Sequence, residues 1–158
     1  MGRVDEPGIP ALVSYSQPHT NAWSENIKSA SGVVFVTPQY NWGYPAVLKN
    51  AIDHLYHEWR DKPVMIVTYG GHGGGRCAKQ LRRVAVRLRM RIVPTSLALR
   101  LSDAIIREGA ELNPDRDFRS FAPQVKRALS ELSDQLEGNE SVLARMRRKW
   151  KVALAVLS

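Results

Sequence analysis

Aromatic, amide and glycine residues gather in two short segments of this chain, and together they suit the binding of a flat aromatic ligand. Residues 38–45 include Tyr40, Asn41 and Trp42, whose rings offer stacking surface and whose amide offers both a donor and an acceptor. Residues 69–75 carry five glycines in their last six positions, and glycine N–H groups can approach a ligand closely and stabilise a partly negative oxygen. The two segments predict a site for a ring system that bears carbonyl groups and ring nitrogens.

The glycine-rich segment does not match the common phosphate-binding motifs. Gly70 and Gly75 have the separation of a P-loop, but Arg76 and Cys77 follow where that motif requires Lys and Ser or Thr. The dinucleotide pattern G-x-G-x-x-G is not present in register either. A plain flexible turn is the alternative, and the density of glycines directly before a predicted helix favours a binding role.

Two other groups of reactive side chains have weaker claims to a function. His54, His57 and Glu58 are close on a predicted helix, but the order H-x-x-H-E matches no zinc-protease spacing and no third ligand is evident. These residues are therefore expected at the surface or an interface. Cys77 begins a basic helix, which can lower a thiol pKa, but the chain has no second cysteine to resolve a disulfide. We expect Cys77 to be a small buried residue.

Both ligand-binding segments follow short apolar runs that predict buried strands. The runs cover residues 33–37 and 64–68, are rich in β-branched residues, and are typical of a parallel sheet covered on both faces. A helical pattern from Pro45 to Trp59 separates them, so the unit reads strand, helix, strand. Because the carboxyl ends of parallel strands share one sheet edge, both segments are expected at the edge where open α/β sheets bind ligands.

Helical periodicity also marks the stretches before and after this unit. A helix over 20–30 has Thr20 or Asn21 as its predicted cap. The remaining pattern predicts helices over 76–89 and 118–136, a further strand within 90–101 and a loop over 102–117. In the helix over 118–136 the expected buried stripe is Phe121, Val125, Leu129, Leu132 and Leu136.

The C-terminal residues 138–158 predict a basic amphipathic helix or tail after a domain that spans 1–137. Apolar residues fall on one face of this segment and basic residues surround them. Such a pattern can lie on an anionic membrane, cover the domain's own core, or contact a partner subunit. We favour the covering role, with membrane contact as the less favoured reading.

Composition limits the remaining function classes. With 158 residues, 44% hydrophobic and 24% charged, the chain fits one globular domain. The net charge of +8 is concentrated in two helical stretches, and without any nucleic-acid-binding motif it favours solvated helix faces over nucleic acid. A single cysteine, no apolar run long enough for a membrane span and a polar N-terminus predict a cytoplasmic protein.

The same residues resemble the NADPH-dependent FMN reductase family, whose members have a flavodoxin-like fold. The likeness rests on P-x-Y-N at 38–41, L-K-N-A-x-D at 48–53 and the Tyr-Gly-rich loop at 69–75. Together and in this order these motifs are far more specific than either loop alone. The resemblance implies a flavodoxin-like three-layer α/β/α fold with a parallel sheet.

The resemblance also implies FMN and NADPH as cofactors and assigns site residues. Hydride would pass from NADPH through FMN to a small-molecule electron acceptor such as a quinone, a flavin or an azo compound. Homodimers or homotetramers are expected, with the 48–53 helix near the contact. A non-catalytic relative that serves as an oligomer partner, or that binds another small aromatic ligand, is the alternative. The implied flavin-binding residues are Pro38, Gln39, Tyr40 and Asn41 around the ring and ribityl chain, and Tyr69, Gly70, Gly71, His72 and Gly73 over its pyrimidine end.

Two departures from the family pattern matter. Position 39 is Gln where the family usually has Glu, and the loop shape is expected to survive this change. The family's N-terminal strand and its phosphate-binding loop have no counterpart near the start of this sequence. The expected fold is therefore an N-terminally truncated one, in which the FMN phosphate lacks its usual donors.

Overall fold

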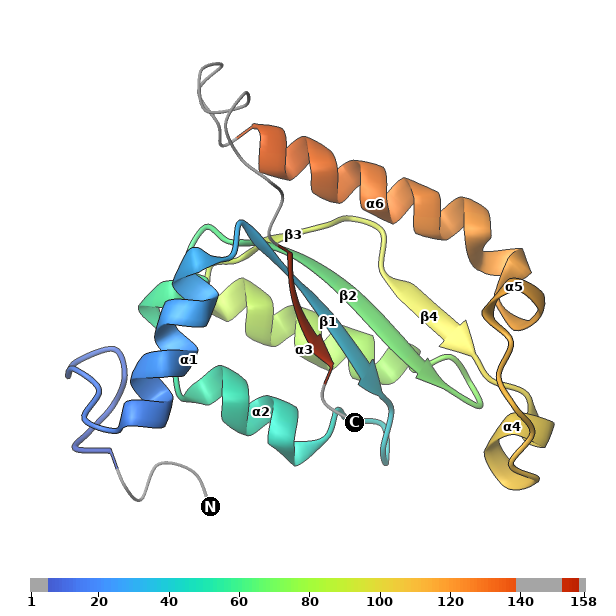
Figure 1. The fold of residues 1–158 in the computed structure, drawn as a ribbon, viewed down its shortest axis with the longest axis horizontal. Coiled ribbons are helices and arrows are strands. Elements are labelled where there is room, and N and C mark those ends of the chain that lie inside the picture. Colours follow the sequence, from blue (N-terminus) through green and yellow to red (C-terminus); the bar gives the residue numbers. More distant parts are fainter. Residues whose placement is uncertain (1–5, 139–151, 157–158) are drawn as a thin grey trace.

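A parallel sheet forms the centre of the molecule. The computed structural model describes residues 6–138 and 152–156. The sheet has five strands in the order β3-β2-β1-β5, with β4 also paired to β2 (Figure 1). All of these pairs are parallel. The strands are β1 (Gly32–Pro38), β2 (Pro63–Gly70), β3 (Arg91–Ile92), β4 (Leu97–Arg100) and β5 (Val152–Val156).

The two predicted central strands are confirmed, and they pair directly. Val33 lies opposite Val64 in the ladder, and Pro38 lies opposite Tyr69. Nearly every residue of β1 and β2 is buried, as expected of strands covered on both faces. The third apolar stretch supplies both β3 and β4, which lie in succession along β2.

Helices cover the sheet on both sides and give three layers. Side chains alternate along β1, so Val33 and Phe35 pack with α1, α2 and α3, while Val34 packs with α6. Figure 1 shows α6 across one face and α1, α2 and α3 across the other. The α/β/α fold class is therefore as predicted. The helices are α1 (Pro18–Ser29), α2 (Ala46–Asp53), α3 (Gly75–Arg87), α4 (Asp103–Arg107), α5 (Pro114–Asp117) and α6 (Ala122–Glu137), with 3₁₀ turns η1 (His57–Trp59) and η2 (Arg119–Phe121).

The helix between β1 and β2 is shorter than predicted. Helix α2 ends at Asp53, and Trp59 lies in η1. Trp59 is nevertheless fully buried, and its indole N–H donates to the Ile52 carbonyl at 3.0 Å. Lys49 and Asp53, four residues apart on α2, form an ion pair with half-exposed side chains.

Two local predictions are wrong. Helix α1 begins at Pro18 after Gln17, so neither Thr20 nor Asn21 caps it; proline at the first position needs no N–H partner. In α6 the buried stripe runs through Ala128, and Leu129 is 50% exposed. The error is confined to this turn, where Leu129 is more apolar than Ala128, and the predicted Leu132 and Leu136 are buried.

Part of the segment predicted as a C-terminal helix or tail forms a strand and not a helix. Val152–Val156 forms strand β5, which pairs with β1 in parallel, with Gly32 opposite Val152 and Val36 opposite Val156. The rest of the predicted tail after Gly138 lies outside the described residues. The backbone of β1 is therefore paired along both of its edges. Within the described residues, no helix has the length and apolar character needed to cross a membrane.

Candidate functional site

The two predicted ligand-binding loops meet at the carboxyl edge of the sheet. The N–H of Gln39 donates to the Tyr69 carbonyl at 3.0 Å, which joins the loops where β1 and β2 end. Burial raises the pKa of the Tyr69 phenol, and the nearby Tyr40 phenol adds to the rise. The structure thus brings both segments together at the edge that the strand pattern predicted.

A tight, strained turn presents the aromatic residues of the first loop. Tyr40 and Gly43 exchange two backbone hydrogen bonds, each 2.9 Å long. Between them, Asn41 has φ 48° and Trp42 has φ 70°, so both occupy the left-handed region. This conformation suits a two-residue hairpin turn, but for Trp it costs about 1–3 kcal/mol. Tyr40 and Trp42 are each 62% exposed as a result.

The glycine loop is shaped so that side chains do not fit at two positions. Gly73 and Gly74 have φ 75° and 80°. A Cβ added at Gly73 would lie 2.7 Å from the Ala98 carbonyl oxygen, and one at Gly74 would lie 2.7 Å from Thr68 Cβ. The Thr68 hydroxyl donates to the Gly73 carbonyl at 3.0 Å. These contacts hold the turn against β2 and β4, so it is not a plain flexible turn.

Gln39 links the first loop to the start of α3. Its side-chain oxygen accepts from the Cys77 N–H at 3.1 Å, which satisfies one of the free N–H groups at the helix N-terminus. Cys77 is buried, as predicted, and burial raises its thiol pKa to about 11. The glutamine at position 39 thus joins the first loop to the first turn of α3.

Several polar groups at this edge have no partner in the described part of the chain. The N–H groups of Gly71 and His72 donate to no backbone acceptor there, and no hydrogen bond is made there by the exposed Asn41 side chain. Together with the exposed Tyr40 ring, these donors suit a flat ligand with carbonyl and ring-nitrogen acceptors. Pro38 and Gly73 are buried and support the loops. The residues present therefore fit a flavin ring.

The structure reveals a contact beside the site that the sequence analysis did not predict. The guanidinium carbon of Arg76 lies 3.5 Å from the centroid of the Trp42 ring. From sequence, Trp42 is expected in the aromatic surface of the first loop, whereas Arg76 has no predicted role. The sequence offered one signal for this contact, a basic residue directly after the glycine run together with an aromatic residue in the other loop.

The structure gives Glu58, in the segment that also holds His54 and His57, a structural role. The Glu58 carboxylate is buried and accepts hydrogen bonds from the Ser24 hydroxyl at 2.6 Å and the Tyr15 hydroxyl at 2.9 Å. It anchors α1 and the chain before it to η1. Among the residues that the structure describes, no three His, Cys, Asp or Glu side chains are arranged to hold a metal ion.

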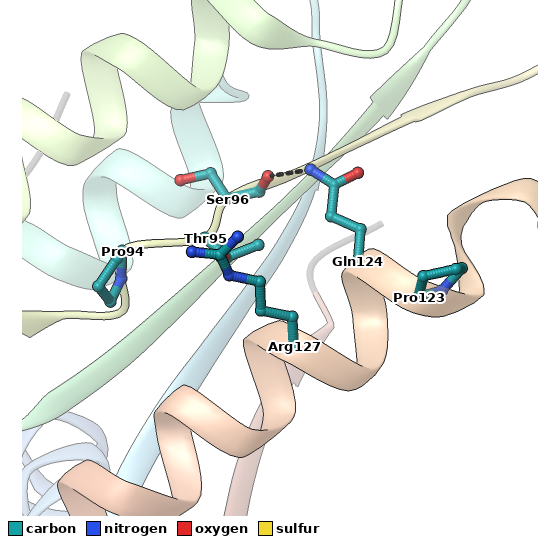
Figure 2. A pocket seen from close by; sticks show the side chains of 6 residues that line it. All are labelled: Pro94, Thr95, Ser96, Pro123, Gln124 and Arg127. Atoms are coloured by element: carbon teal, nitrogen blue, oxygen red, sulfur yellow. Dashed lines mark hydrogen bonds between the residues drawn. The ribbon is translucent and has the colours of Figure 1, made fainter.

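A separate hollow of about 640 Å³ lies between α6 and the segment that joins β3 to β4 (Figure 2). Polar groups around the hollow form hydrogen bonds with one another. Gln124 donates to the Ser96 carbonyl at 3.2 Å, and Glu131 accepts from Thr95 and Arg127 at 2.9 Å each. This hollow is an open surface feature distinct from the loops at the carboxyl edge.

Comparison with known proteins identifies relatives along most of the chain. A family model described as NADPH-dependent FMN reductase matches residues 4–103. A protein of Schizosaccharomyces pombe named NAD(P)H-dependent FMN reductase is 53% identical over 137 residues, which cover 85% of this chain and 68% of that protein. A Saccharomyces cerevisiae protein of the same name is 50% identical over 93 residues, 56% of this chain and 49% of its own length. The chain thus spans about half to two thirds of these relatives.

Solved structures support the fold. An oxidoreductase from Corynebacterium diphtheriae has a TM-score of 0.60 at 17% identity, covering 80% of this chain and 66% of its own. A flavoenzyme NAD(P)H:(acceptor) oxidoreductase from Paracoccus denitrificans has a TM-score of 0.57 at 16% identity, covering 81% of this chain and 77% of its own. At these identities the similarity establishes the architecture alone.

Proposed function

Because this chain belongs to the NADPH-dependent FMN reductase family, we propose that it is an NAD(P)H-dependent flavin oxidoreductase. Its substrates in this proposal are NADPH and a small-molecule acceptor such as a quinone or a flavin. An Escherichia coli relative, 44% identical over 87 residues that cover 51% of this chain and 43% of that protein, is named quinone reductase. Bound FMN would supply the redox chemistry, taking hydride from NADPH and passing electrons to the acceptor.

The observation that carries this proposal is the junction of the two loops at the sheet edge. Gln39 bonds to Tyr69 through the backbone and to Cys77 through its side chain, so the ring-facing segments are held in one geometry before any ligand binds. Such preorganisation reduces the ordering cost of binding. The flavin-binding residues in this proposal are Pro38, Gln39, Tyr40, Asn41, Tyr69, Gly70, Gly71, His72 and Gly73.

Each part of the site would contribute differently. The exposed Tyr40 ring provides a surface for the flat ligand. The free N–H groups of Gly71 and His72 would donate to ring carbonyl oxygens and stabilise negative charge that develops on reduction. The Asn41 amide can donate or accept at the ring edge. No acid–base pair is needed for this chemistry.

Assembly and location extend the proposal. We propose that the chain forms homodimers or homotetramers through the surface around α2, and that it acts in the cytoplasm. We also propose that residues 1–137 form the reductase domain and that 138–158 add their strand to its sheet. Size-exclusion chromatography with light scattering tests the first of these, and a monomer at all concentrations would contradict it.

Titration of the purified chain with FMN tests the proposed function. We expect saturable quenching of flavin fluorescence, and weaker binding in Asn41→Ala, whose exposed side chain makes no hydrogen bond within the described residues. Val86→Ala, a change at an exposed apolar residue of α3 away from the loops, is the matched control. Absence of saturable binding by the folded wild-type chain would exclude the reductase and favour the non-catalytic alternative.

A further inference from the structure

Arg76 is a cation at the rim of the proposed site that no carboxylate neutralises within the described residues. It is exposed and lies in the first turn of α3, directly after the glycine loop. Some other arginines of the described chain form ion pairs, as Arg116 does with Asp117 and Arg127 with Glu131, whereas Arg83 on the same helix forms none there. No such ion pair is found there for Arg76. Its charge is therefore available to a ligand.

The contact with Trp42 fixes where this charge sits. The guanidinium carbon is 3.5 Å from the ring centroid, so the planar group lies over the indole. Trp42 is itself held by the closed turn between Tyr40 and Gly43. Stacking uses the flat face of the guanidinium and leaves its N–H donors at the edge. A freely moving arginine side chain loses considerable conformational entropy when it binds a ligand. Because stacking on Trp42 already restricts the side chain, less entropy is lost on binding.

The surroundings of Arg76 favour an anion. The first turn of α3 contains no acidic residue, and the helix N-terminus carries a partial positive charge. A cation in this position opposes the helix dipole, so Arg76 does not stabilise the helix electrostatically. A bidentate guanidinium beside a helix N-terminus matches the geometry and charge of a phosphate group.

We propose that Arg76, held on Trp42, binds the 2′-phosphate of NADPH and gives the chain a preference for NADPH over NADH. This inference rests on the proposed function for the identity of the dinucleotide. The ring-facing donors, Gly71 and His72, belong to the glycine loop, whereas Arg76 lies beyond that loop on the rim. In this proposal, the adenosine half of the dinucleotide extends across this rim when its nicotinamide contacts the flavin. Of the two dinucleotides, only NADPH carries the 2′-phosphate for an arginine there to recognise.

Binding of an NADPH fragment tests the proposal without any flavin or turnover. Calorimetric titration with adenosine 2′,5′-bisphosphate and with 5′-AMP compares ligands that differ by the phosphate in question. We expect the wild-type chain to bind the bisphosphate about tenfold more tightly, the scale of one charge-assisted contact. Arg76→Gln should lose that difference. Arg83→Gln removes the same charge from an exposed position of the same helix and should retain it.

Either of two results from these titrations would overturn the proposal. One is a preference for the bisphosphate that survives in Arg76→Gln. The other is an equal loss in Arg83→Gln, because general attraction by a basic helix would then explain binding. Thermal unfolding of both variants checks that they remain folded. We expect them to do so because both positions on α3 are exposed.

Kinetics and flavin binding separate the possible phosphate sources. In an active chain, Arg76→Gln should raise KM for NADPH about tenfold and leave KM for NADH nearly unchanged. If the variant instead weakens FMN but not riboflavin, Arg76 contacts the FMN phosphate and the proposal is wrong. If the fragment binds as expected while the chain neither binds nor reduces FMN, the reductase function fails and the phosphate site stands.

Discussion

Replacing Gly73 with alanine should damage both the stability and the flavin affinity of the chain. The φ of 75° is unfavourable for alanine, by about 1–2 kcal/mol. The new Cβ would also lie 2.7 Å from the Ala98 carbonyl oxygen, and relieving an overpacked contact of this kind costs about 1–3 kcal/mol. We therefore expect the free energy of unfolding to fall by roughly 2–5 kcal/mol.

Gly75→Ala is the matched control because the same substitution meets opposite conditions there. Gly75 is the first residue of α3, and no atom lies within 4 Å of an added Cβ. Alanine should leave stability unchanged or raise it by about 0.5–1 kcal/mol. Urea unfolding, followed by circular dichroism, measures both variants.

Flavin titration of the same two proteins connects the loop to function. Gly73→Ala should weaken FMN binding about tenfold or more, because relief of the contact moves the N–H groups of Gly71 and His72. Gly75→Ala should bind FMN normally. Equal stabilities and equal FMN affinities in the two variants would refute the argument that this turn is sterically fixed.

Three further predictions concern buried polar and thiol groups. Burial alone raises the pKa of Glu58, but hydrogen bonds from Ser24, Tyr15 and the backbone outweigh it and hold that pKa below its usual 4.5. Glu58→Gln should therefore lower the free energy of unfolding by about 1–3 kcal/mol near neutral pH. The difference in stability from wild type should shrink as pH falls through the folded-state pKa of Glu58. A difference that stays constant with pH would contradict this. Lys62 donates at 2.6 Å to two carbonyls at the end of α1, so Lys62→Met should lower the free energy of unfolding by about 1–2 kcal/mol in urea, and an unchanged midpoint argues against it. Because burial raises the Cys77 pKa to about 11, iodoacetamide should label it at mildly alkaline pH only after unfolding; rapid labelling of the folded chain would show an accessible thiolate.

The strands and the site edge could be predicted because their signals are local. The apolar runs at 33–37 and 64–68 are too short and too β-branched for helices, and the loops after them had to share an edge once the strands were parallel. The burial of Cys77 was expected because the chain has no second cysteine with which it could form a disulfide. The strand signals depend on neighbours within a few residues.

Features that depend on distant partners could not be predicted. The segment Val152–Val156 contains alternating alanine and larger apolar residues, which fit a helix face as well as a strand, and only pairing with β1 selects the strand. The contact between Arg76 and Trp42 joins the first turn of α3 to the first loop, where Trp42 has a left-handed backbone conformation that tryptophan disfavours. Glu58 read as a surface residue because its partners Ser24 and Tyr15 lie far away in the sequence.

Anaerobic addition of NADPH to the FMN-loaded chain tests the central claim most directly. The measured quantity is the visible absorption of the flavin, recorded before and after addition, with a quinone added last. We predict that NADPH bleaches the flavin and that the quinone restores its colour. A chain that binds FMN saturably but whose flavin stays oxidised with excess NADPH would contradict the assignment as a reductase.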